Sequence, residues 1–294
     1  MNEGFAVVNQ ADKTALNKRG VEAIEFAFKR AKEEKRAAFI PFITAGDPNI
    51  LISQELILAL SDIGADIIEL GVPFSDPVAD GPTIQASSQR ALKNGITPED
   101  VLTLVSKVRD KGCTTPIILM GYYNPVLQYG LSNFADKMVD VGADGTIIAD
   151  LPIEEAHEWR RIAAINGLAN IFLVAPTTPI ARARFIAEAS TGFLYYVSVT
   201  GITGARTQLP PQLQDALKQV KAVSPVPVGV GFGISSPEQV KMLSPFADGI
   251  IVGSAIIKVI QKHIVEKEIG FDIEPNLVDE VKSFVSKLRA AVGR

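Results

Sequence analysis

The segment Gly64-Ala-Asp-Ile-Ile-Glu-Leu-Gly71 joins the end of a helical pattern to a short apolar run. Similar junctions recur in Gly142-Ala-Asp-Gly-Thr-Ile-Ile148 and in Phe246-Ala-Asp-Gly-Ile-Ile251. A turn that is reused before several strands of one chain is typical of a fold assembled from repeated β/α units. The repeat therefore predicts that these junctions lie at the same end of a barrel.

Eight short apolar runs are spaced along the chain and alternate with longer amphipathic patterns. Most of the runs are unbroken, as expected for parallel strands that are covered on both faces. We expect strands at Ala38–Thr44, Ala65–Gly71, Pro116–Met120, Gly145–Asp150, Ala169–Val174, Phe193–Ser198, Val226–Phe232 and Gly249–Gly253. We expect helices at Pro98–Lys111, Leu131–Val141, Glu154–Asn166, Ala181–Ala189, Pro237–Leu243 and Leu277–Val292.

This alternation predicts an α/β fold, a (β/α)8 TIM barrel that forms a single domain. A doubly wound open sheet is the alternative, but no Gly-x-Gly-x-x-Gly pattern follows the first strand. Residues 21–294 contain no linker or change of composition that would divide the barrel. Residues 1–20 are expected to form a polar N-terminal arm.

The bulk composition excludes several classes of protein. The 294-residue chain has a net charge of −4, which gives no general electrostatic reason to bind nucleic acid or an anionic membrane. The single cysteine, Cys113, excludes an internal disulfide framework. No apolar run is long enough to cross a membrane, and the polar first twenty residues lack the features of a secretory signal. We expect a cytoplasmic protein, or one of the plastid stroma if the source is eukaryotic.

Glu69 and Asp80 are the candidate acid/base pair. Glu69 closes an apolar strand on the same face as Ile67, where a buried carboxylate costs free energy unless it has a partner or a function. Asp80 follows in a loop rich in Gly and Pro, and two carboxylates placed in this way suit acid/base catalysis. The alternative is that Glu69 is a satisfied polar residue at a strand end and that Asp76, Pro77 and Asp80 only form a turn.

The sixth expected strand and its loop supply further candidates, because active sites of such barrels lie at the carboxyl ends of the strands. Tyr195 lies late in this strand and is either a site residue or a core aromatic. The segment Thr200-Gly-Ile-Thr-Gly-Ala-Arg206 follows and is a candidate mobile lid. Thr203 and Arg206 would supply its polar contacts on closure.

A phosphate site is expected where the last two strands end. Gly231-Phe-Gly-Ile-Ser235 ends the seventh strand, and Gly253-Ser-Ala-Ile256 ends the eighth before a helical pattern. Glycines let backbone N–H groups approach an anion, and the N-terminus of a helix adds partial positive charge. In TIM barrels phosphate commonly binds at these two loops.

The positions of His and Lys exclude two kinds of chemistry. His157 and His263 both fall in helical patterns, so we expect no His-based metal site. No lysine lies in an expected strand, which argues against a Schiff base or a pyridoxal phosphate anchor in the barrel. Carbon–carbon cleavage would then require a substrate that contains its own electron sink.

At these residues the chain closely resembles the tryptophan synthase α chain family, in order from about residue 21 to the C-terminus. The departures are the N-terminal arm and Pro245-Phe246, where a glycine-containing turn is usual. The matching motifs are Pro41-Phe-Ile-Thr-Ala-Gly-Asp-Pro48, Glu69–Gln85, Leu119-Met-Gly-Tyr-Tyr-Asn-Pro125, Asp150-Leu-Pro152, Gly201-Ile-Thr-Gly-Ala-Arg206, Gly231-Phe-Gly-Ile-Ser235 and Ile251-Val-Gly-Ser-Ala255.

The resemblance implies a lyase that cleaves indole-3-glycerol phosphate to indole and glyceraldehyde 3-phosphate in tryptophan biosynthesis. It implies that Glu69 is the general acid/base and that Asp80 holds the indole N–H and stabilises the positive charge that develops there. It further implies substrate contacts from Tyr195, Phe42, Leu119 and Ile153, and from Thr203 in the lid. The phosphate would be held by Gly204, Gly233, Gly253 and Ser254.

The same resemblance implies a partner, the tryptophan synthase β chain, in an α2β2 tetramer. Pyridoxal phosphate would belong only to that partner, and this chain would need no cofactor or metal. The segments Pro73–Pro77 and Tyr122–Leu127 and the lid would face the partner, which receives the indole.

Three alternatives remain open on the sequence. A stand-alone indole-3-glycerol-phosphate lyase of the same family would have the same motifs. A phosphosugar isomerase would favour a second phosphate site, related to the first by the symmetry of the half-barrels. A non-catalytic phosphate-binding barrel subunit is disfavoured by the intact Glu69, Asp80 and Tyr195.

Overall fold

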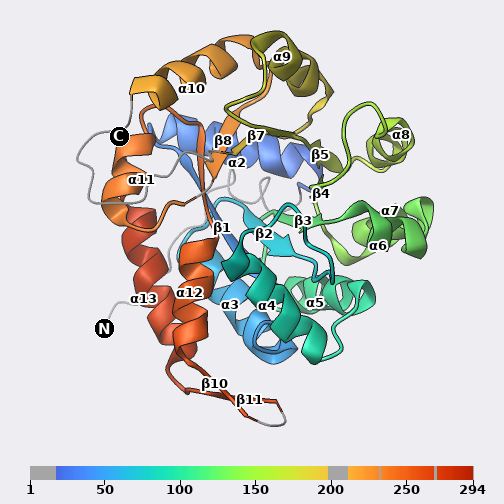
Figure 1. The fold of residues 1–294 in the computed structure, drawn as a ribbon, viewed down its shortest axis with the longest axis vertical. Coiled ribbons are helices and arrows are strands. Elements are labelled where there is room, and N and C mark those ends of the chain that lie inside the picture. The colour runs from blue at the N-terminus through green and yellow to red at the C-terminus, as the bar shows by residue number, and fades with distance from the viewer. Residues whose placement is uncertain (1–17, 198–210, 232, 268–269, 294) are drawn as a thin grey trace, which may run out of the picture.

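Nine parallel strands form one curled sheet in the part of the chain that the computed structural model describes, residues 18–197, 211–231, 233–267 and 270–293. Figure 1 shows helices on every side of these strands. The strands are β1 (Ala38–Thr44), β2 (Ile68–Gly71), β3 (Ile117–Gly121), β4 (Gly145–Ile148), β5 (Ala169–Ile171), β6 (Leu173–Val174), β7 (Leu194–Val197), β8 (Val228–Gly231) and β9 (Gly249–Val252).

The sheet closes through the run that contains β5 and β6. Its strand order is β5-β4-β3-β2-β1-β9-β8-β7-β6, so both ends of the sheet belong to this one run. Only Phe172 separates the two strands, and its carbonyl oxygen accepts a hydrogen bond from the N–H of Tyr195 on β7. The expected (β/α)8 barrel is therefore confirmed, with its fifth strand divided into two short pieces.

Most of the helices surround the barrel, whereas α2 (Val21–Glu33) lies behind the strands in the view of Figure 1. A small antiparallel hairpin, β10 (Ile264–Glu266) with β11 (Phe271–Ile273), extends from the bottom of that view. The helices are α2 (Val21–Glu33), α3 (Ile50–Asp62), α4 (Pro82–Lys93), α5 (Pro98–Asp110), α6 (Tyr123–Tyr129), α7 (Leu131–Val141), α8 (His157–Ile165), α9 (Ile180–Ala189), α10 (Pro211–Val223), α11 (Pro237–Leu243), α12 (Ser254–Lys262) and α13 (Leu277–Ala290).

Local sequence explains where several helices begin and end. Thr97 and Asp100 form a reciprocal capping box at the start of α5, and Pro98 occupies its first turn. Gly142 ends α7 in a left-handed conformation with φ of 79°, which glycine adopts at little cost. The expected bounds of α7 and α11 match the structure, whereas α8 begins three residues later than expected because residues 153–155 form a turn.

Buried apolar side chains form two clusters, one inside the barrel and one outside it. The inward-facing residues Ile40, Ile67 and Ile118 belong to one buried cluster with Ile24 and Phe28 of α2. Helix α2 therefore supplies part of the core inside the barrel. A second, larger cluster lies between the outer face of the strands and the surrounding helices.

The three Gly/Phe-Ala-Asp junctions share one hydrogen-bonding arrangement. In each, the aspartate N–H donates to the carbonyl oxygen of a residue in the preceding strand, and the aspartate carboxylate accepts the N–H of that same residue, all at 2.8–2.9 Å. The pairs are Asp66 with Phe39, Asp144 with Ile117, and Asp248 with Val228. The aspartates therefore tie neighbouring strands together where the strands begin, at one end of the barrel, as predicted.

A fourth junction uses threonine instead of aspartate. The N–H of Thr191 donates to the carbonyl oxygen of Asn170, and the Thr191 hydroxyl accepts the Asn170 N–H at 2.8 Å. Each aspartate of the other three junctions also forms an ion pair, whereas the hydroxyl is neutral and brings no charge that has to be compensated. The ion pairs join Asp66 to Arg36, Asp144 to Arg109, and Asp248 to Lys221.

We expect Asp66→Asn to lower the free energy of unfolding by about 3–5 kcal/mol, the range for removing one partner of a buried ion pair. Asp66 is fully buried and accepts hydrogen bonds from Arg36, Arg30 and the Phe39 N–H. Urea denaturation at pH 7 would measure the change. Asp62→Asn, at an exposed position on α3, is the control and should leave stability within about 0.5 kcal/mol of the unmodified chain.

The same pair predicts a pH dependence. Burial alone would raise the pKa of Asp66, but the hydrogen bonds from Arg36, Phe39 and Arg30 hold it below its ordinary value. A lowered pKa in the folded state means that this stabilisation is present at neutral pH and is lost as the pH falls through the folded-state pKa. The difference between Asp66→Asn and the unmodified chain should shrink in acid; a constant difference would contradict this account.

Candidate active site

A cavity with about 520 Å³ of empty space lies at the carboxyl ends of the strands. This space includes the open solvent at the mouth of the cavity. The structure brings most of the candidates from the sequence together here. Those that line the cavity are Phe42, Glu69, Asp80, Tyr195, Gly233, Gly253 and Ser254.

Glu69 is a buried carboxyl group that forms no ion pair with a cation of the described residues. It lies on β2 opposite Phe42 of β1 and Ile118 of β3, and its side chain is 1% exposed. Its Oε2 atom has no hydrogen-bond partner among the described residues. Burial, and secondarily the charge of Asp80, raise the pKa of Glu69 to about 8. At neutral pH most of this carboxyl group is therefore protonated.

Asp80 reaches the same cavity from the loop between β2 and α4. Its Oδ2 atom accepts a hydrogen bond from the Tyr122 hydroxyl at 2.9 Å. Burial raises the pKa of Asp80 above its ordinary value, and the bond from Tyr122 opposes that rise. The pair thus combines a neutral carboxyl group at Glu69 with a carboxylate at Asp80, the separation of roles that acid/base chemistry needs.

Helix α4 fixes the end of the Asp80 loop. Arg90 on α4 forms a bidentate ion pair with Asp47, at 2.7 and 2.8 Å, and both side chains are buried. Closer to the loop, the Gln85 side chain donates to the Asp80 carbonyl oxygen at 2.8 Å. Because α4 begins at Pro82, these bonds hold the backbone two residues beyond Asp80 against the barrel.

Tyr195 projects into the barrel beside the two carboxyl groups. Burial raises the pKa of its phenol well above the ordinary value, with smaller contributions from the charges of Glu69 and Asp80. A Cβ atom on Gly231 would lie only 2.3 Å from the Tyr195 oxygen, so the phenol has room because position 231 is glycine. Tyr195 is therefore both a cavity residue and a member of the inner core.

The opposite side of the cavity is built from backbone. Gly233 has φ of 71°, and a Cβ atom there would meet nothing within 4 Å. Gly253 precedes Ser254, the first residue of α12, so the N-terminus of that helix lies at the cavity. Such a surface suits an anion. The predicted contacts at Thr203 and Gly204, and the lid around Arg206, fall outside the described residues.

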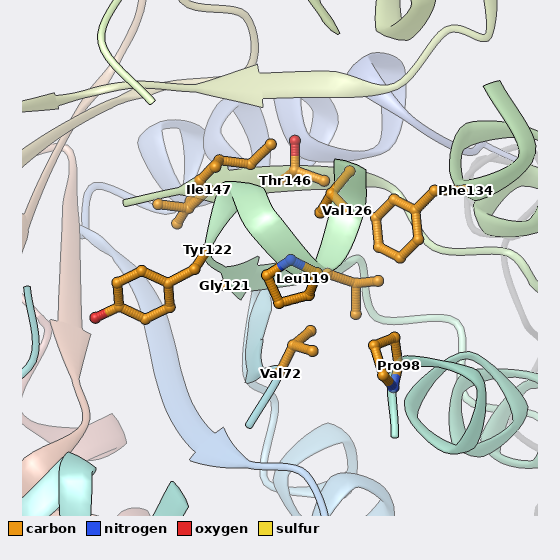
Figure 2. Close-up of a pocket in the computed structure, with 11 residues that line it drawn as sticks. Val72, Pro98, Leu119, Gly121, Tyr122, Val126, Phe134, Thr146 and Ile147 are labelled. Carbon is orange, nitrogen blue, oxygen red and sulfur yellow. The ribbon is translucent and has the colours of Figure 1, made fainter. Parts of the chain in front are cut away.

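Two of the expected wall residues, Leu119 and Ile153, are not among the residues that line this cavity. Leu119 projects from the outer face of β3 into a separate apolar cavity between the barrel and α6 and α7 (Figure 2). Strand alternation places the next residue, Met120, in the site cavity instead. Ile153 is buried in the outer core cluster and is not among the residues that line the site cavity.

Sequence reasoning also missed residues that the structure adds to the site. Met120, Ile84 and Ile234 supply apolar surface, and Tyr122 binds Asp80. The strand register could have identified Met120, because it lies two residues beyond Ile118, which pairs with Glu69. Within the described residues, no group of three or more His, Cys, Asp or Glu side chains is arranged to hold a metal ion.

Comparison with known proteins identifies relatives across most of the chain. The family model of the tryptophan synthase alpha chain matches residues 28–286. A tryptophan synthase alpha chain of Geobacter sulfurreducens is 47% identical over 266 residues, which cover 90% of this chain and 97% of that protein. The corresponding protein of Thermoanaerobacter pseudethanolicus is 46% identical, over 90% of this chain and 98% of its own length.

Solved structures agree with these relatives. Tryptophan synthase subunit alpha from Legionella pneumophila superimposes with a TM-score of 0.81 at 40% identity, covering 92% of this chain and 97% of that one. A chain of Mycobacterium tuberculosis tryptophan synthase gives a TM-score of 0.82 at 35% identity, covering 94% and 100%. With its barrel, its paired carboxyl groups and these relatives, the chain belongs to the tryptophan synthase alpha chain family.

Proposed function

We propose that Glu69 and Asp80 carry out the cleavage of indole-3-glycerol phosphate to indole and glyceraldehyde 3-phosphate in this chain. Membership of the tryptophan synthase alpha chain family makes the chain a carbon–carbon lyase of tryptophan biosynthesis. The observation that carries the assignment of residues is the neutral, buried Glu69 in one cavity with the carboxylate of Asp80 and an anion-binding backbone surface.

The first step is a proton transfer to the ring. Indole is an electron-rich ring, and a proton added at its C3 atom converts it to an indoleninium cation that can accept the electrons of the bond to be broken. Glu69 is protonated at neutral pH and supplies this proton, which leaves it as a carboxylate.

Asp80 acts while the ring is positively charged. A carboxylate that accepts a hydrogen bond from the indole N–H stabilises the charge that develops on that nitrogen. The stabilisation is strong because the cavity is largely apolar around the pair, with Phe42, Met120 and Ile84 on its walls.

The second step breaks the carbon–carbon bond. The Glu69 carboxylate removes the proton from the hydroxyl group on the carbon attached to C3, and that carbon becomes the aldehyde. The electrons of the broken bond return to the ring and give neutral indole, while Glu69 regains its proton for the next cycle. Gly233, Gly253 and Ser254 would hold the phosphate throughout, away from the reacting bond.

A β chain is the proposed partner, since the alpha chain family takes its name from one subunit of tryptophan synthase. Two exposed apolar side chains support the expected contact surface. Val78, next to segment 73–77 in the Asp80 loop, is 82% exposed. Leu127, within segment 122–127 on α6, is 48% exposed. We propose an α2β2 tetramer in which pyridoxal phosphate is bound by the β chain alone.

The remaining assignments stay predictions. They are the division between a polar arm at residues 1–20 and a barrel at residues 21–294, the cytoplasmic location, and the roles of Thr203 and Gly204. No helix in the described ranges has the length and apolar character needed to cross a membrane.

The family assignment does not favour the phosphosugar isomerase or the non-catalytic barrel subunit. Assays of indole release with and without a β chain would separate an α subunit from a stand-alone lyase.

Glu69→Gln keeps the size of the side chain and removes its titrating proton. We expect indole release from indole-3-glycerol phosphate to fall by at least about 10²-fold, the lower end for loss of a general acid/base. Glu55→Gln, an exposed change on α3, is the control and should retain full activity. More than about a tenth of the original activity in Glu69→Gln would refute the assigned role.

The raised pKa of Glu69 predicts how activity depends on pH. Because protonated Glu69 begins the reaction, kcat/KM should fall as the pH rises through about 8, where the free enzyme loses this proton. In the acid direction, kcat/KM should fall as Asp80 becomes protonated, at a pH above the ordinary range for aspartate because burial raises its pKa. A profile that stays flat from pH 7 to pH 9.5 would exclude Glu69 as the initial acid.

Gly233→Asp tests the phosphate site. The new carboxylate would project into open space beside the bound phosphate, and repulsion should weaken the affinity for glyceraldehyde 3-phosphate at least about tenfold, ~1.4 kcal/mol. Titration calorimetry would measure the dissociation constant. Gly112→Asp is the matched control, because Gly112 also has a positive φ (88°) and open space at the Cβ position but lies after α5. Equal affinity in both variants would place the phosphate elsewhere.

A further inference from the structure

Tyr122 lies between the loop that carries Asp80 and helix α6. Its ring is buried, and in Figure 2 its hydroxyl group points away from Leu119 and Phe134 on the other side of the apolar cavity. The ring packs against Phe74 of the Asp80 loop, with 5.2 Å between the ring centroids. Tyr122 therefore contacts this loop through its ring as well as its hydroxyl group.

The two hydrogen bonds of the hydroxyl group determine where its proton points. The N–H of Ala79 can only donate, so the Tyr122 oxygen accepts that bond, at 3.1 Å. The single hydroxyl proton is then directed to Oδ2 of Asp80, at 2.9 Å. Burial and the charge of Asp80 both raise the pKa of Tyr122, so the phenol keeps the proton that it donates.

This arrangement leaves the two oxygens of Asp80 in different environments. Oδ2 is bound to Tyr122, while Oδ1 has no hydrogen bond recorded within the described residues. A carboxylate held by one oxygen cannot rotate freely, and the other oxygen remains available for a donor on a bound molecule. Asp80 lines the site cavity, so such a donor would come from the substrate.

We propose that Tyr122 is a positioning residue for Asp80, which fixes the carboxylate so that its second oxygen meets the indole N–H. The inference rests on the proposed function of Asp80. It assigns Tyr122 no direct contact with the substrate.

The fold of the loop does not depend on this hydroxyl group alone. The Phe74 N–H donates to the Ser88 hydroxyl at 3.1 Å, and the Gln85 side chain binds the Asp80 carbonyl oxygen. Tyr122→Phe keeps the buried ring and its contact with Phe74. The loop should therefore keep its backbone path in this variant while the carboxylate loses its donor.

We expect Tyr122→Phe to lower kcat for indole release about tenfold or more, as is typical when a hydrogen bond to a charged group is lost. The dissociation constant of glyceraldehyde 3-phosphate should stay within about twofold, since this ligand lacks the indole ring. An unchanged kcat would overturn the proposal, and so would a parallel loss of kcat and of this affinity, which would indicate a general disturbance of the site.

The pH profile supplies a second measurement. Among the described residues, the titratable groups that face Asp80 are Glu69 from β2, Tyr195 from β7 and Tyr122 itself. Tyr122 is the one that lowers the pKa of Asp80, so its removal should move the acid limb of the kcat profile to higher pH. An acid limb at an unchanged pH would contradict the proposal.

Tyr129→Phe is the matched control. Tyr129 is the last residue of α6, the helix that Tyr122 caps, and its hydroxyl group also donates to a carboxylate, that of Glu99, but this pair is exposed. The control removes the same kind of bond from the other end of that helix. It should change neither kcat nor the acid limb; an effect equal to that of Tyr122→Phe would assign the change to α6 as a whole and overturn the proposal.

A double-mutant cycle with Asp80→Asn shows whether Tyr122 acts through Asp80. If it does, adding Tyr122→Phe to Asp80→Asn should cause less than a twofold further loss of kcat. Independent, multiplicative losses would overturn the proposal. If Asp80→Asn alone keeps its activity, the proposed function of Asp80 itself is wrong. If Asp80→Asn is inactive and Tyr122→Phe has normal activity, only the positioning role of Tyr122 is wrong.

Discussion

The burial of the Glu69 carboxyl group beside Asp80, with no compensating cation among the described residues, governs the chemistry of the site. The other deeply buried carboxylates of the described chain are partnered: Asp47 by Arg90, Asp66 by Arg36 and Asp144 by Arg109. Oε2 of Glu69 has no hydrogen-bond partner among the described residues, and the carboxyl group is kept neutral instead. A cation at this position would hold the carboxyl group ionised and remove the proton that starts the proposed reaction. The site therefore uses the buried, neutral state of Glu69, which the stability of the fold alone would not favour.

The two ends of the barrel have different roles: one stabilises the fold and the other forms the candidate site. At the end where the strands begin, four junctions each join neighbouring strands by paired hydrogen bonds, three with aspartate and one with Thr191. At the opposite end, glycines and loops line the cavity and leave backbone groups available to a ligand. The firmly bonded end holds β2 and thereby Glu69 in position, so that the loops can serve binding.

The Asp80 loop connects the cavity with the surface proposed for the partner. One side of the loop is held by α4, through Ser88 and Gln85, and the other by Tyr122 at the start of α6. A β chain that packs against Val78 and Leu127 would therefore contact the Asp80 loop itself and α6, the helix whose start holds that loop. Such contacts offer a physical route by which a partner could change the position of the catalytic carboxylate without entering the site.

Strand alternation and the repeated Ala-Asp junction are local properties, so they predicted the class of fold and the face on which Glu69 lies. The motifs shared with the tryptophan synthase alpha family indicated the same two carboxyl groups that the structure brings into one cavity. Only the tertiary structure showed that Met120 rather than Leu119 faces the cavity, since the pairing of β3 with β2 sets which face is inward. It likewise revealed Thr191 in the place of an aspartate and the bond between Tyr122 and Asp80. These contacts join residues far apart in the chain, and closure of the barrel, which no local pattern encodes, brings them together.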